Sequence, residues 1–363
     1  MKKVLGNLTV LAVGCIIALG LLELFLRWAQ PIPNRIKGDK IVLPHNQLYQ
    51  FTIPTHVGLD TVIKHRKNAL GFRGPEVPDA WDSSLTIIAV GGSTTECYLI
   101  SDGNDWPALV QNKLQPKYHK VWVNNAGLDG HSTFGHQLLL NDYILPLKPD
   151  FVLFLLGANE VGRTDLDQYD KAQFKQNLSA WKRTLYHSEV VSFILNIQRA
   201  AKADELDLNH QYLQLQTLEH RPTDSLAIMA QIKSDSITLR SYHTRIQNLI
   251  DSCQRYHIQP IFITQPSLLG VGVDPDTRID LSTVAWNEAN GASYWRRLEA
   301  YNNVLKEAAS QNDVFCIDLA HLLPKRSAYF YDNIHYTNDG SEAVSKIIAE
   351  KLAAYLASQA ESF

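Results

Sequence analysis

Apolar residues along this chain follow two patterns, which alternate. Continuous apolar runs are typical of strands buried on both faces of a parallel sheet, and they occur at 85–90, 121–125, 151–156, 260–264 and 314–318. Apolar residues at three- to four-residue spacing predict helices around 106–114, 135–145 and 294–309, one long helix over 228–253, and a closing helix over 344–356. Strands that alternate with helices predict a three-layer α/β/α sandwich around a central, mostly parallel five-stranded sheet.

The N-terminal segment departs from this pattern. From Val4 to Leu22 the chain carries no charge, and a helix of that length comes close to spanning a hydrocarbon core of roughly 30 Å. Two lysines precede the run, as in a signal sequence. We therefore favour a transmembrane signal anchor over 1–28. Its alternatives are a cleaved signal peptide, for which 27–31 offers no good cleavage site, and a lipoprotein modified at Cys15, although the apolar run continues beyond that residue.

The remaining chain is expected to divide into two parts. Residues 29–83 read as a proline-punctuated stem with short extended pieces. Residues 84–360 form the expected catalytic domain, with a mostly helical insertion at about 165–257 and an irregular surface insertion at 265–290. With an anchor at its N-terminus, this body is expected outside the cytoplasm, in the periplasm if the source is bacterial.

Composition narrows the class of protein. Of 363 residues, 45% are hydrophobic and 20% charged, which excludes wholesale disorder. The formal charge of −3 gives no basic footprint for nucleic acid. Four scattered cysteines form no Cys-x-x-Cys pair, so a zinc ribbon is not indicated and a disulfide framework is not required. These numbers leave a globular, enzyme-like body.

In parallel sheets ligands bind beyond the carboxyl ends of the strands, so the residues that follow each strand are the candidates for chemistry. Gly91-Gly92-Ser93 follows the first strand, and the glycines permit a tight turn that leaves Ser93 at its tip. Ser93 can be a nucleophile or an N-cap. A phosphate-binding loop is the third interpretation, but the Gly-Lys-Ser/Thr ending of a nucleotide site is missing.

The second and third strands end in groups that can donate hydrogen bonds. Gly130 lies in a turn after the second strand, where a glycine lets the backbone N–H approach a reacting carbonyl, although a plain turn is the simpler interpretation. Asn159 follows the third strand, and its amide can donate to an oxyanion or cap the next turn.

An acid–base pair precedes the closing helix. Asp332 stands three residues before His335 in one loop, close enough to orient the imidazole by accepting its second N–H. A serine hydroxyl needs such a base before it can act as a nucleophile. The order of these groups along the chain, and their places at the strand ends, predict that they meet at one edge of the sheet.

In these blocks the sequence resembles the SGNH (GDSL-like) hydrolase family over roughly 84–357, without the helical insertion. The matching blocks are Gly91-Gly92-Ser93, Asp129-Gly130, Gly157-Ala158-Asn159-Glu160 and Asp332-x-x-His335. Two positions depart from the family pattern, because Gly92 and Glu160 stand where the family usually has aspartate. Neither carries the nucleophile, the base or the oxyanion donor.

The resemblance implies a serine esterase that acts through an acyl-enzyme, with no metal or organic cofactor. Ser93, His335 and Asp332 would form the catalytic triad, and the amides of Ser93 and Gly130 with the Asn159 side chain would form the oxyanion hole. An ester of a carbohydrate or a lipid would be the substrate, with an O-acetyl or another short acyl group expected.

Two other functions stay open. The same acyl-serine can pass its acyl group to a sugar hydroxyl, and an anchored body outside the cytoplasm suits O-acyl transfer to cell-envelope polysaccharide. A catalytically silent binding module of an envelope assembly is the second alternative.

Overall fold

The computed structural model describes residues 2–29, 36–37, 40–161, 186–205, 212–287 and 289–360. Two compact units divide the chain. One comprises 1–44 with 168–210, and the other comprises 45–167 with 211–363. The expected boundaries at 28/29 and 83/84 stay a prediction.

The second unit is built on a five-stranded parallel sheet with the order β11-β8-β7-β5-β6. Its strands are β5 (Leu85–Gly91), β6 (Val121–Asn125), β7 (Phe151–Leu156), β8 (Gln259–Thr264) and β11 (Cys316–Ile317). Strand β5 pairs with both β6 and β7, so the chain order reverses beside its carboxyl end. Such a switch point is where ligands bind in open α/β sheets.

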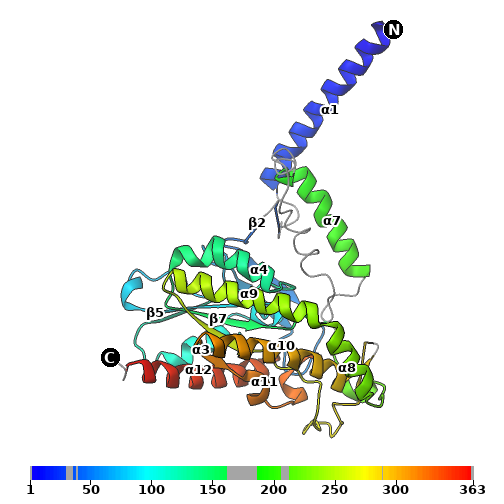
Figure 1. Ribbon diagram of the computed structural model, residues 1–363. Helices are drawn as coiled ribbons and strands as arrows, with labels where there is room; N and C mark the ends of the chain where they lie inside the picture. The colour runs from blue at the N-terminus through cyan, green and yellow to red at the C-terminus, as the bar shows by residue number, and fades with distance from the viewer. Residues whose placement is uncertain are drawn as a thin grey trace. The chain divides into compact units, whose positions relative to one another are not determined.

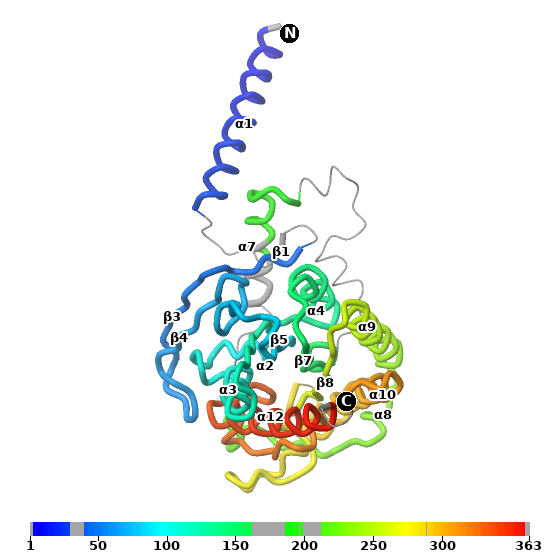
Figure 2. The backbone as a smooth tube through the Cα atoms, turned by 90° about the vertical axis from the view of Figure 1, so that its left-hand side faces the viewer, coloured from blue at the N-terminus to red at the C-terminus, as the bar shows by residue number. Residues whose placement is uncertain are grey.

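Helices cover both faces of the sheet (Figures 1 and 2). Helices α3 (Trp106–Leu114) and α12 (Asn338–Ala360) pack on one face; α4 (Thr133–Leu139), α9 (Ser236–Arg255) and α10 (Gly291–Gln311) pack on the other. Trp106 and Val344 are fully buried on the first face with the Ile87 side of the sheet. Side chains of this size each contribute roughly 1.5–3 kcal/mol when buried. The predicted three-layer α/β/α sandwich is confirmed.

Three details of the sequence-based prediction are wrong. The long helix over 228–253 is two helices, α8 (Ser225–Ser234) and α9, which are separated at Asp235. The carboxylate of Asp235 accepts two hydrogen bonds of 2.8 Å from the guanidinium of Arg297. The insertion at 265–290 is not confined to the surface, since Leu269 and Leu281 are fully buried. Strand β11 covers two of the five residues expected, 314–318.

Shorter elements complete this unit. They are β3 (Leu48–Thr52), β4 (Val62–Arg66), α2 (Ser93–Glu96), β9 (Ala285–Trp286), β10 (Ala289–Asn290) and α11 (Leu319–Leu322). Strands β3 and β4 form an antiparallel hairpin. Downstream of it, Arg73 exchanges two backbone hydrogen bonds with Asn125, of 2.9 and 2.7 Å, and so attaches the upstream segment to the end of β6.

The first unit contains α1 (Lys2–Ala29), the short antiparallel pair β1 (Ile36–Lys37) and β2 (Lys40–Ile41), and α7 (Glu189–Glu205). Residues 3–29 are long and apolar enough to cross a membrane, as both an anchor and a signal sequence are. The Glu23 carboxylate of α1 accepts hydrogen bonds from Ser188 and from the backbone of Glu189 and Val190, at the start of α7. Residues 165–185 and 206–211 of the predicted helical insertion lie outside the described residues.

Candidate active site

A tight turn connects strand β5 to α2 and carries Ser93 as the first helical residue. The turn needs glycine at Gly91, because a Cβ there would collide with the hydroxyl of Thr95 and lie 2.8 Å from the carbonyl oxygen of Leu155. Ser93 is 7% exposed at the carboxyl edge of the sheet. The turn therefore fixes the direction in which the serine hydroxyl leaves the backbone.

Ser93, His335 and Asp332 form a continuous hydrogen-bonded chain. The Nε2 atom of His335 lies 2.7 Å from Oγ of Ser93, and Nδ1 lies 2.5 Å from Oδ2 of Asp332. The other carboxylate oxygen, Oδ1, accepts the backbone N–H groups of Ile334 (2.9 Å) and His335 (2.7 Å). An ionised Asp332 places the proton on Nδ1, which leaves Nε2 as the acceptor for the serine hydroxyl.

The charge state of Asp332 is set by opposing effects. Burial raises its pKa, but the neighbouring imidazole and the three hydrogen bonds that the carboxylate accepts outweigh burial, so the pKa lies below its ordinary value. The carboxylate is therefore ionised at neutral pH and holds the imidazole in one tautomer.

Gly130 lies in a β-turn in which His131 N–H donates to Leu128 C=O (3.2 Å). Its φ of +72° is the value that the third residue of a type II turn requires, which explains the glycine. Leu128 N–H donates to the carbonyl of Gly91 (3.0 Å), so the turn is attached to the end of β5, two residues before Ser93.

Asn159 lies beside the serine turn. Its Nδ2 donates to the carbonyl of His131 (2.9 Å), and a Cβ at Gly92 would collide with that nitrogen. The asparagine amide thus occupies the space into which a side chain at position 92 would point. This contact gives a physical reason for glycine at 92, the first departure from the family pattern.

Glu160, the second departure, has a structural contact. Its side chain is buried, and Oε1 accepts the backbone N–H of Thr133 (2.6 Å) at the start of α4. The Thr133 hydroxyl in turn accepts Nε–H of Arg245 from α9 (2.6 Å). The longer acid therefore joins the end of β7 to the helices on one face of the sheet.

A small, mostly apolar cavity of about 10 Å³ adjoins the serine. It is lined by Ser93, Thr94, Cys97, Leu99, Ile100, Tyr331, His335 and Tyr336. A volume of this size holds about one water molecule or a group of similar size. The Tyr331 ring stacks on the imidazole of His335 with 5.5 Å between centroids, and so supports one face of it.

Sequence reasoning missed the wall of this cavity. Leu99 and Ile100 follow the serine turn within the same segment, and Tyr331 and Tyr336 flank the Asp332–His335 pair. Their closeness to the motifs along the chain is the signal that could have identified them. Among the described residues, no cluster of three or more histidine, cysteine or acidic side chains could hold a metal ion.

Several solved structures are similar to this chain at low identity. An acetylxylan esterase from Geobacillus stearothermophilus is 15% identical, with 74% of this chain and 94% of that chain covered and a TM-score of 0.43. A putative lipolytic protein of the G-D-S-L family from Desulfitobacterium hafniense is 12% identical, with 74% and 99% covered and a TM-score of 0.41. No match was found among curated proteins.

The comparison with family models is specific. The model of the GDSL-like Lipase/Acylhydrolase family matches residues 89–343, which include the serine turn, the Gly130 and Asn159 loops and the Asp332–His335 pair. Enzymes of this family hydrolyse esters. The chain belongs to the GDSL-like lipase/acylhydrolase family and is an ester-hydrolysing enzyme.

Proposed function

We propose that this enzyme is a serine esterase in which Ser93, His335 and Asp332 are the catalytic triad. The observation that carries the proposal is the hydrogen-bonded chain from Oγ of Ser93 through both ring nitrogens of His335 to the Asp332 carboxylate. A nucleophile, a base and a group that orients the base stand in the order that acyl transfer needs.

In the first half-reaction, Oγ of Ser93 attacks the ester carbonyl carbon while Nε2 of His335 takes the hydroxyl proton. The carbonyl oxygen becomes an oxyanion, which the amides of Ser93 and Gly130 and the Asn159 side chain stabilise. Nδ1–H of the imidazolium stays bonded to Asp332. The bond to the alcohol then breaks, and the imidazolium returns the proton to the departing oxygen.

In the second half-reaction, water takes the place of the alcohol. His335 removes a proton from the water as the water oxygen attacks the acyl carbon. As the second tetrahedral intermediate collapses, the imidazolium returns this proton to Oγ of Ser93, which leaves a carboxylic acid and the free enzyme. Each oxyanion donor in such a site typically accounts for about 10²–10³ in rate.

We further propose that the acyl group is short, with acetyl as the first choice. The cavity beside Ser93 has room for a group of about the size of a methyl, and Leu99, Ile100 and Tyr336 give it apolar walls. A longer chain would have to displace these side chains.

The test is Ser93→Ala assayed with p-nitrophenyl acetate. We expect turnover to fall at least about 10³-fold with the fold unchanged by circular dichroism. A fluorophosphonate probe should label the native protein and not the variant. Undiminished turnover by Ser93→Ala would overturn the assignment, and native protein that neither turns over esters nor takes up the probe would favour a silent module.

Acyl transfer to a sugar hydroxyl shares every step up to the acyl-serine. The two reactions differ in their product, since hydrolysis releases free acetate and transfer gives an acetylated sugar. Incubation with an acetyl donor and an envelope oligosaccharide, followed by mass spectrometry of the sugar, separates them. We expect free acetate as the main product.

We propose that α1 remains attached as a membrane anchor, that 29–83 precede a catalytic domain of 84–360, and that this domain is periplasmic. The uncharged run from Val4 to Leu22 within α1, and the two lysines that precede this run, support the proposal. Protease added to spheroplasts should digest the body while α1 stays in the membrane fraction. A body that is protected until the membrane is lysed would contradict this orientation.

A further inference from the structure

A buried ion pair connects the segment upstream of β5 to the loop that carries Gly130. Lys67 lies just after β4, is 2% exposed, and places its Nζ 3.5 Å from Oε1 of Glu96. Glu96 is the last residue of α2, three residues after Ser93, and its Oε2 accepts the backbone N–H of Asp129 (2.6 Å). One carboxylate therefore bridges a buried cation and the turn that holds Gly130.

The geometry of that turn gives this bridge a consequence. The turn closes with the N–H of His131, and the Asp129 N–H is bound by Glu96. With Leu128 N–H on the carbonyl of Gly91, the turn is fixed at two successive amides. Glu96 holds the peptide before Asp129, and the Leu128 carbonyl holds the N–H of His131, so both peptides that flank the Asp129–Gly130 peptide are fixed. With Gly130 at a φ of +72°, the peptide between them takes the orientation of a type II turn, which sets the direction of the Gly130 N–H.

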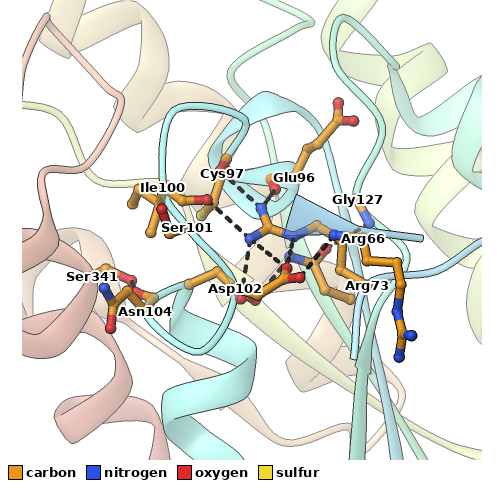
Figure 3. Close-up of polar contacts among 12 residues, drawn as sticks. Arg66, Arg73, Glu96, Cys97, Ile100, Ser101, Asp102, Asn104, Gly127 and Ser341 are labelled. Atoms are coloured by element: carbon orange, nitrogen blue, oxygen red, sulfur yellow. Dashed lines mark hydrogen bonds and ion pairs between the residues drawn. The ribbon is translucent and has the colours of Figure 1, made fainter. Parts of the chain in front are cut away.

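A second buried cation of the same upstream segment holds the far end of α2. Arg73 is 1% exposed, and Figure 3 shows its guanidinium enclosed by the loop that follows Glu96. Nη1 donates to the carbonyls of Glu96 (2.8 Å) and Cys97 (2.9 Å), and Nη2 donates to that of Ile100 (3.0 Å). Nε donates to Asp102 (3.2 Å).

Arg73 thus binds backbone carbonyl groups at the carboxyl end of α2 and in the loop that follows it, where the last carbonyls of a helix lack partners within the helix. In Figure 3 the Glu96 side chain points away from the guanidinium of Arg73, so the two cations act on different groups. A Cβ at Gly127 would collide with the backbone nitrogen of Glu96, so the Gly130 loop packs directly on the serine helix. Helix and loop are therefore held as one piece.

We propose that Glu96 is a positioning residue for the oxyanion hole, with Lys67 as its buried counter-ion: its carboxylate holds the Asp129 N–H so that the Gly130 amide is aimed at the reacting carbonyl oxygen. The inference rests on the proposed function. It extends the catalytic machinery to Lys67, which lies upstream of the residues that the family model matches. Neither side chain touches the reacting atoms.

Two double variants test this role. Lys67→Met with Glu96→Gln removes both charges but keeps a neutral oxygen that can accept the Asp129 N–H. Lys67→Met with Glu96→Leu removes the same charges and the acceptor. Because neither variant leaves a lone buried charge, both avoid the destabilisation that breaking a buried pair causes. Lys113→Met, which breaks an exposed ion pair with Glu342, is the surface control.

With p-nitrophenyl acetate we expect the glutamine variant to keep kcat within about fivefold of the native enzyme, and the leucine variant to lose about 10²-fold in kcat at nearly constant KM. The affinity of the leucine variant for a short alkyl boronic acid, which forms a tetrahedral adduct on the serine, should fall by a similar factor. A purely structural role would lower the melting temperature of both variants without this difference in boronate affinity.

Equal kcat in the two double variants would overturn the inference, and so would a leucine variant that binds the boronate as tightly as the native enzyme. Should the leucine variant fail to fold, Lys67→Met with Glu96→Ala takes its place, since it also lacks an acceptor for the Asp129 N–H; a kcat and a boronate affinity equal to those of the glutamine variant would exclude a role for the carboxylate. Ser93→Ala separates the two proposals. If Ser93→Ala is active, the proposed triad is refuted. If Ser93→Ala is inactive and the two double variants have the same kcat, only the positioning role of Glu96 is refuted.

Discussion

Replacing Asp332 by asparagine separates the orientation of the imidazole from the folding of its loop. An asparagine Oδ1 can still accept the backbone N–H groups of Ile334 and His335, so the loop keeps its hydrogen bonds. Its NH₂ group would then face Nδ1 of His335, where the carboxylate oxygen now lies at 2.5 Å. The ring responds by carrying its proton on Nε2, where it can no longer accept the proton of Ser93.

The size of the effect follows from charge. With charge centres about 4 Å apart and an effective dielectric constant of about 20, an aspartate stabilises the imidazolium by about 4 kcal/mol. That loss corresponds to about 10³ in rate, and the wrong tautomer adds to it. We therefore expect kcat for p-nitrophenyl acetate to fall about 10³–10⁴-fold in Asp332→Asn, with KM little changed.

The control is Asp332→Ala, which also leaves the two backbone N–H groups without their acceptor. Each buried donor left unpaired costs about 1–3 kcal/mol, so urea unfolding should show a loss of stability in Asp332→Ala that Asp332→Asn does not share. An Asp332→Asn enzyme that keeps more than a tenth of native kcat would refute the role given to this carboxylate.

Three further predictions concern the surroundings of the site. Leu99→Ala should widen the acyl cavity and raise the kcat/KM ratio of p-nitrophenyl butyrate to acetate about tenfold, whereas an unchanged ratio would place the acyl group elsewhere. Gly92→Asp, which introduces the usual family residue, should lower kcat about 10²-fold because its Cβ collides with Asn159; equal or higher activity would contradict the packing. Burial, with the nearby positive charges, lowers the pKa of His65 from 6.5 to about 3, so the unfolded chain takes up a proton near pH 6.5 that the folded protein does not. The free energy of unfolding should therefore fall by on the order of a few kcal/mol as the pH is lowered from 6.5 to 3. Urea unfolding of His65→Phe should show a smaller fall over this range, and the same dependence on pH in both proteins would contradict the prediction.

The sheet could be predicted from the sequence because a strand buried on both faces needs apolar side chains at every position. Phe151–Leu156 meets that condition throughout, and all of its residues are buried. The break between α8 and α9 could not be predicted in the same way. The apolar spacing continues through Asp235, and Arg297, the residue that its carboxylate contacts, lies 62 residues away along the chain.

Of the site, the sequence predicted the residues that stand in short motifs. Ser93 was identifiable because it follows a predicted strand, and Asp332 and His335 because they stand together before a predicted helix. The structure brings all three side chains together. Gly92 and Glu160 were recognised as departures, but their contacts with Asn159 and Thr133 depend on tertiary packing. No spacing along the chain encodes those contacts.

The contacts of Arg73, in the segment between β4 and β5, cannot be predicted from a pattern along the sequence, and they lead to a final prediction. No motif or spacing in the sequence marks Arg73, because three of its hydrogen-bond acceptors are backbone carbonyls, which any residue supplies. A chain that begins at residue 84 would leave those carbonyls and the buried Asp105 without the guanidinium, a loss of about 3–5 kcal/mol for a broken buried charge pair.

We therefore expect a chain of 84–363 to unfold at a markedly lower urea concentration than a chain of 45–363, and to bind a fluorophosphonate more slowly per folded molecule. In the longer chain, Arg73→Lys should remove most of the advantage in urea stability over the chain of 84–363, because one ammonium group cannot replace the five donors of a planar guanidinium. Equal stability and equal labelling of the two chains would mean that the segment before β5 is a dispensable stem, as the boundary expected at 83/84 implies.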